Sequence, residues 1–157
     1  MKTFIGTKII QATPMTRAEY NAYRNWTLPA NEDGSDPGYL VEYLDGGAPN
    51  HPDHKGYISW SPAEQFDAAY VDIGYVGNLQ PHQARVVAEQ AELMSRTIKL
   101  DAFTRSEVYK GLDREEQILL SAQLEAMMLY CRILSRRIDI FRKADPSVNH
   151  DFGLNVH

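Results

Sequence analysis

The sequence predicts an α+β protein in which a small antiparallel β-sheet with short helices is followed by a long C-terminal helical hairpin. In the first half, short runs rich in Val, Ile, Thr and Tyr alternate with turns that contain Gly and Pro. In the second half, two long segments repeat apolar residues every three or four positions, as amphipathic helices do. We therefore expect a β-rich N-terminal module over residues 1–75, a hairpin over 78–145 and a tail over 146–157.

The first half contains the signals of a small sheet with two short helices. Strands are predicted at 2–12, 39–44 and 56–60. Thr16 and Glu19 form a Thr-x-x-Glu capping box, which predicts a first helix. Ser61 as N-cap and Pro62 at the first helical position predict a second helix that reaches about Tyr70.

The second half begins with a helix that we expect from Pro81 to about Phe103. Its predicted buried stripe consists of Val87, Ala91, Met94 and Ile98. A further helix should begin after Asp113, whose carboxylate suits an N-cap, and should reach about Arg142.

This last helix carries two apolar rows. The first is a heptad seam of Leu120, Leu124, Met127, Cys131, Leu134, Ile138 and Phe141. The second consists of Leu119, Ala126, Tyr130, Ile133 and Ile140. Because one partner helix covers about one row, we expect a closed homo-oligomer, with packing of the second row on the N-terminal sheet as the alternative.

Composition excludes several functional classes. The net charge of −5 argues against general DNA or RNA binding, which needs a basic surface. No uninterrupted apolar run approaches the roughly 20 residues of a membrane span, so we expect no membrane insertion. The start of the chain lacks the apolar stretch of a secretory signal, which favours a cytoplasmic location. The single cysteine, Cys131, falls in a helical pattern and is expected to pack in the core.

The sequence shows no catalytic constellation, no cofactor motif and no strong metal site. His51 and His54 form an HxxH motif that suits zinc chemically, but its Pro-containing loop does not by itself fix a tetrahedral geometry. We therefore favour a solvated loop there. A metal-dependent hydrolase that uses these two histidines is kept as a minor hypothesis.

Basic and aromatic side chains of the hairpin are the best candidates for a ligand site. Arg132, Arg136 and Arg137 lie within about one turn, Arg85 stands near the start of the other helix, and guanidinium groups bind phosphates in bidentate fashion. The equally weighted alternative is that these bases complement the helix dipole and keep the helix soluble. The aromatic candidates for stacking on a base are Phe103, Tyr109 and Tyr130, although hairpin-turn packing would also explain them.

Both halves resemble known phage modules. The first resembles a module common in phage accessory proteins, through Tyr39-Leu40-Val41-Glu42-Tyr43 and Gly56-Tyr57-Ile58-Ser59-Trp60-Ser61-Pro62. The second is similar to a helical hairpin shared by anti-CBASS cyclic-nucleotide sponges and the first-described Thoeris anti-defence sponges. This second likeness rests on Pro81-His82-Gln83, Arg85-Val86, Glu116, Leu119-Leu120, Gln123, Met127, Tyr130, Leu134, Arg137-Ile138 and Phe141.

The resemblance implies a non-catalytic cytoplasmic phage protein that sequesters cyclic ADP-ribose isomers made by TIR enzymes. Some relatives also hold cyclic di- or trinucleotides. It further implies a homohexamer, or alternatively a homodimer, and a site that includes Arg85 and Arg137. Leu124 stands where anti-CBASS hairpins commonly have a lysine. The other function we consider is a non-catalytic oligomeric protein that grips a host or phage protein partner.

Overall fold

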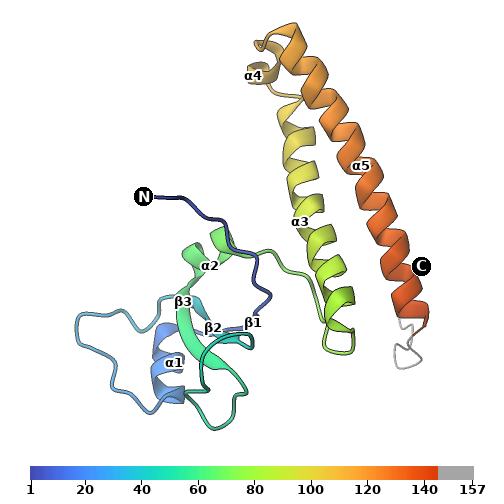
Figure 1. The fold of residues 1–157 in the computed structure, drawn as a ribbon. Helices are drawn as coiled ribbons and strands as arrows, with labels where there is room; N and C mark the ends of the chain where they lie inside the picture. The colour runs from blue at the N-terminus through green and yellow to red at the C-terminus, as the bar shows by residue number, and fades with distance from the viewer. Residues whose placement is uncertain (145–157) are drawn as a thin grey trace, which may run out of the picture. The chain divides into compact units, whose positions relative to one another are not determined.

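The computed structural model describes residues 1–144, and the chain divides between Tyr70 and Val71 into two compact units (Figure 1). The first unit contains a three-stranded sheet and two short helices, and the second contains two long helices. The predicted α+β class is therefore confirmed. The predicted tail over 146–157 lies outside the described residues.

The sheet of the first unit is antiparallel, in the order β1-β2-β3. The strands are β1 (Gln11–Pro14), β2 (Gly38–Tyr43) and β3 (Tyr57–Pro62). The strand predicted at 2–12 was placed too early, because Gln11 already pairs with Glu42 and β2 ends at the next residue, Tyr43. Residues further toward the N-terminus therefore have no partner strand.

The two short helices of the first unit follow from local signals. Helix α1 (Arg17–Tyr23) has the predicted capping box, in which Glu19 accepts hydrogen bonds from the backbone N–H and the hydroxyl of Thr16. Helix α2 (Ala63–Ala69) begins one residue later than predicted. Ser61 is not its cap, because Ser61 still pairs with Tyr39 in the sheet.

The second unit is the predicted hairpin. Helix α3 (Pro81–Phe103) and helix α5 (Arg114–Lys143) are joined through a one-turn helix, α4 (Glu107–Lys110). The Asp113 carboxylate accepts a hydrogen bond from the Glu116 N–H, as an N-cap should. Ile73, Val76 and Leu79 pack against the hairpin core, so the segment before α3 belongs to this unit.

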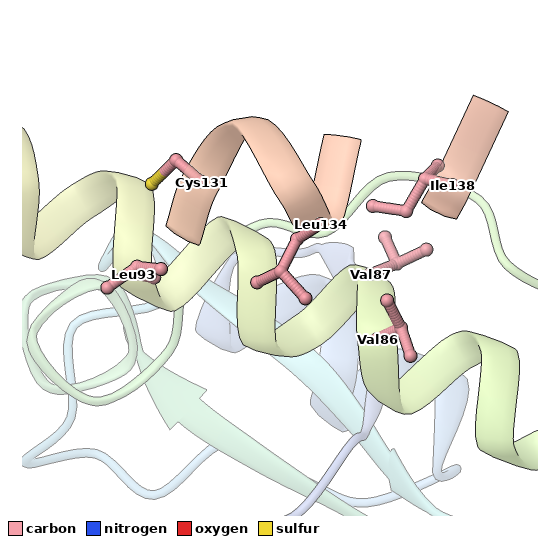
Figure 2. Close-up of a cluster of buried hydrophobic side chains, with 6 residues drawn as sticks. All are labelled: Val86, Val87, Leu93, Cys131, Leu134 and Ile138. Carbon is pink, nitrogen blue, oxygen red and sulfur yellow. The ribbon is translucent and has the colours of Figure 1, made fainter. Parts of the chain in front are cut away.

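The hairpin core confirms the heptad seam of α5 from Met127 to Phe141, while Leu120 and Leu124 are half-buried outside this core (Figure 2). Cys131, Leu134 and Ile138 are buried, and Met127 and Phe141 pack against them. The stripe predicted on α3 is confirmed at Val87, which is buried in the core, but it is wrong further along, since Met94 is 39% and Ile98 is 62% exposed.

Polar residues on the buried face of α3 explain this error. That face carries Val86, Gln90, Leu93 and Thr97, and both polar residues are hydrogen-bonded. Gln90 donates to the Ser135 hydroxyl at 3.0 Å, and Thr97 donates to the Leu93 carbonyl at 2.7 Å. A prediction based on apolar residues alone leaves out such positions and therefore assigns the wrong face of the helix as buried.

Candidate functional site

The face of α5 opposite to the hairpin core is apolar and exposed. Leu119, Leu129, Ile133 and Ile140 are 62%, 53%, 46% and 65% exposed. With Ala122, Ala126 and Arg136 they repeat at spacings of three and four residues. We call this row of seven residues the outer seam, because it has the spacing of a coiled-coil interface and one charged member.

The outer seam sharpens the second apolar row that the sequence predicts. Four of the predicted residues, Leu119, Ala126, Ile133 and Ile140, belong to it. Leu129 was missed. Tyr130 is not part of the outer seam, because it lies about 100° around the helix from Leu129, and its hydroxyl donates a hydrogen bond to Glu89 of α3. Two opposite apolar faces also explain why α5, among residues 1–144, is long and apolar enough to cross a membrane by length and composition alone.

Charges divide α5 into two halves of opposite sign. Between residues 114 and 128 there are three acids and one base, and between 129 and 143 there are five bases and one acid. This asymmetry follows the helix dipole, with acids toward the N-terminus and bases toward the C-terminus. It also makes the helix complementary to an antiparallel copy of itself.

The arginines predicted to bind a ligand are exposed but do not converge within one chain. In the described part of the chain, no ion pair involves Arg85, Arg132, Arg136 or Arg137. Successive residues of an α-helix are about 100° apart, so Arg132 and Arg137 point about 140° apart. Arg132 and Arg136 therefore lie on one side of α5, and Arg137 lies on the other.

Arg137 belongs to a small polar group with Tyr130 and Glu89. Its guanidinium lies 5.9 Å from the ring centroid of Phe141. The hydrogen bond to Glu89, followed by desolvation, raises the pKa of Tyr130, while the nearby Arg137 opposes this change. Arg85 stands one helical turn before Glu89, so this side of the hairpin carries two cations around one carboxylate.

Phe103 and Tyr109 lie at the turn of the hairpin. Their rings meet edge to face at 6.2 Å, and the Tyr109 hydroxyl donates to the Gln117 carbonyl at 3.0 Å. Tyr109 also lines a shallow hollow of about 450 Å³ together with Arg114, Gln117, Ile118, Ser121, Ala122 and Glu125. Tyr109 therefore packs within the turn and also borders an open surface.

The two groups of candidate residues are too far apart to form one site in a single chain. Thr97 of α3 contacts Cys131 of α5, which places Phe103 level with about residue 125. Arg136 lies about 11 residues further along α5, or about 17 Å at about 1.5 Å per residue. A pocket that uses both groups therefore requires a second subunit.

A second group of polar side chains, which consists of two histidines, a tyrosine and a glutamate in mutual contact, lies in the N-terminal unit. His54 Nδ1 donates to a Glu42 oxygen at 2.8 Å, and the Tyr23 hydroxyl lies 2.9 Å from His54 Nε2 and 3.5 Å from His51 Nδ1. Burial acts to raise the pKa of Glu42, but hydrogen bonds from His54 and from the backbone N–H groups of Gly56 and Lys55 lower it overall. The predicted solvated loop is therefore wrong for the two histidine side chains, which are 13% and 16% exposed, while Pro52, Asp53 and Lys55 of the same loop are exposed.

Comparison with known proteins finds one related family. Residues 80–140 match the family described as Sequestin. The matched segment contains all of α3 and α4 and most of α5, and the hairpin is thus similar to this family. No curated protein and no solved structure matches the chain.

Proposed function

We propose that this protein is a phage anti-defence sponge that binds and sequesters cyclic nucleotide immune signals without cleaving them. The observation that carries the proposal is a hairpin similar to the Sequestin family, whose name denotes sequestration, with four exposed arginines that have no ion-pair partner in residues 1–144. Its ligands are cyclic ADP-ribose isomers made by TIR enzymes, with cyclic di- and trinucleotides as further candidates. The protein acts in the bacterial cytoplasm.

The chemistry of the ligand matches the side chains on offer. A cyclic ADP-ribose isomer carries a pyrophosphate and a purine, so a pocket needs fixed cations and a flat apolar or aromatic surface. Arg132 and Arg136 offer the cations, and Phe103 and Tyr109 offer the rings. The exposed Met94 and Ile98 of α3 add apolar surface.

Antiparallel pairing of α5 with the same helix of a partner subunit would bring these groups together. In the register that matches the two outer seams, Ala126 faces Leu129 of the partner subunit and Leu119 faces Arg136 of the partner subunit. The acidic half of each helix then faces the basic half of the other. Arg136 of one subunit would thus lie near the hollow beside Tyr109 of the partner subunit, and the gap of about 17 Å within one chain would disappear.

The test is native mass spectrometry of the protein purified from cells that express a TIR enzyme. We expect an even-numbered homo-oligomer, a hexamer or a dimer, with small molecules retained at up to one per subunit. Heating the complex should return the cyclic ADP-ribose isomer intact. Recovery of a cleaved product would identify an enzyme instead, and a ligand-free monomer would contradict both the assembly and the binding function.

The alternative function is a non-catalytic oligomeric protein that grips a host or phage protein. The exposed outer seam supports it, because an apolar helix face suits a helical partner as well as a second copy. This alternative predicts no thermal shift with any cyclic nucleotide and a stoichiometric complex with a protein partner. The same nucleotide titration therefore separates the two functions.

A further inference from the structure

We propose, on the basis of the assembly in the proposed function, that charged residues beside the outer seam fix the antiparallel pairing of α5 with a second copy in a single register. Glu125 forms an ion pair with Arg132 of the partner subunit, and Glu116 forms one with Arg137 of the partner subunit. Because the pairing is two-fold, each ion pair occurs twice.

The four charged residues flank the outer seam on the surface of α5. In the heptad repeat of the seam, Glu125 and Arg132 share one flanking position, and Glu116 and Arg137 share the flanking position on the other side. All four side chains belong to exposed residues, and none makes an ion pair within residues 1–144. In coiled coils, charges at these two positions determine the choice and the orientation of the partner helix.

The register that matches the two outer seams brings opposite charges together. It places Glu125 level with Tyr130 of the partner subunit, so Arg132 of the partner subunit lies two residues, or about 3 Å, further along the axis. Glu116 and Arg137 of the partner subunit are offset by the same amount. A two-fold axis between antiparallel helices puts the same flank of both helices on one side, so the long side chains of each pair meet there.

Three competing arrangements bring like charges together instead. If the second helix slides by one heptad in one direction, Glu125 faces its own symmetry copy. If it slides in the other direction, Arg132 faces its own symmetry copy and Glu125 faces Asp139 of the partner subunit. In parallel pairing, Arg132 faces Arg137 of the partner subunit. Because like charges at an interface suppress wrong pairings, the charges favour the proposed register over these three.

The Glu125 ion pair also connects the interface with the proposed ligand pocket. Glu125 lines the hollow beside Tyr109, so it brings Arg132 of the partner subunit to the edge of that hollow. A guanidinium has five N–H donors, and a bidentate pair with a carboxylate uses two of them. Arg132 of the partner subunit therefore keeps donors for a phosphate while Glu125 holds its side chain in place.

The experiment reverses each charge of this ion pair in the full chain. Glu125→Arg homodimers contain two arginine–arginine contacts, and Arg132→Glu homodimers contain two glutamate–glutamate contacts. Each variant alone should self-associate about 10-fold more weakly or worse in sedimentation equilibrium. An equimolar mixture should instead form the heterodimer, in which both contacts join opposite charges. Native mass spectrometry identifies this species because the two chains differ in mass.

Two further variants make the outcome decisive. The chain that carries both Glu125→Arg and Arg132→Glu should regain self-association, because opposite charges meet again across the interface. Lys99→Glu, a matched charge reversal at an exposed residue of α3, should leave self-association unchanged. Native self-association of both single variants, or a mixture with no preference for the heterodimer, would overturn the proposal.

Calorimetry with the cyclic ADP-ribose isomer from a TIR enzyme separates this interface from the sponge function. Selective heterodimers of a protein whose native chain binds no cyclic nucleotide would support the interface and contradict the sponge function. Nucleotide binding by the native chain, without charge-dependent pairing of the variants, would support the sponge function and contradict the interface.

Discussion

Arg136 is the residue whose position separates a ligand-binding role from a structural one. It interrupts an otherwise apolar outer seam, and within residues 1–144 it has no ion-pair partner. If Arg136 contacts a phosphate, Arg136→Ala should weaken the binding of the cyclic ADP-ribose isomer by about 1.5–3 kcal/mol, which corresponds to a loss of affinity of about 10- to 150-fold. Calorimetry measures this change. Arg96→Ala, which removes an exposed arginine paired with Glu92, is the control and should leave the affinity unchanged.

Tyr130 reports on the charges around Arg137. Because hydrogen bonding to Glu89 raises its pKa, Glu89→Gln should lower that pKa, and Arg137→Ala should raise it further. A raised pKa in the folded state means that the stabilisation from this phenol is present below the ordinary value of about 10 and is lost as the pH rises through the folded value. The difference in phenolate absorbance between the native chain and Tyr130→Phe gives the pKa. An Arg137→Ala variant with an unchanged pKa would show that Arg137 does not contact this group.

Helix α5 has two faces with different roles, and two adjacent residues separate them. Leu134 is fully buried against α3, whereas Ile133 is 46% exposed. Leu134→Ala should lower the free energy of unfolding by about 2–5 kcal/mol, as large cavities in a packed core do. Ile133→Ala should change the stability of the isolated chain little but weaken self-association. Equal effects of both substitutions in dilute denaturation experiments would contradict the assignment of the two faces.

The elements differ in how far the sequence determined them. The limits of α3 and α5 were predictable, because Pro81, Asp113 and long apolar periodicities are local signals. The buried face of α3 was not, because Gln90 and Thr97 enter the core through hydrogen bonds that no apolar pattern reveals. The contacts that bury His54 are made by Tyr23 and Glu42, which are 31 and 12 residues away from it in the sequence. Sequence distance hid these contacts, and the loop was therefore predicted as solvated.

At the scale of the whole molecule, the outer seam should control assembly. Leu129→Glu places a carboxylate in the middle of this apolar row, where pairing would bury it near its own symmetry copy. We expect the oligomer to dissociate, with native circular dichroism, in sedimentation or native mass spectrometry. Val108→Glu, a change of the same kind at a 65% exposed residue outside the seam and the hollow, should be tolerated better. An oligomer that survives Leu129→Glu would move the interface to another surface.

A shared pocket makes a prediction that no single-chain site can satisfy. If Arg136 of one subunit and Tyr109 of the partner subunit contact the same ligand, Arg136→Ala and Tyr109→Ala chains should each bind poorly alone. When the two are co-expressed, a mixed dimer contains one pocket with both substitutions and one pocket with neither. Random pairing in a two-fold dimer therefore restores about one quarter of the sites to native affinity. A site within one chain would restore none, because every chain would still lack one of the two side chains.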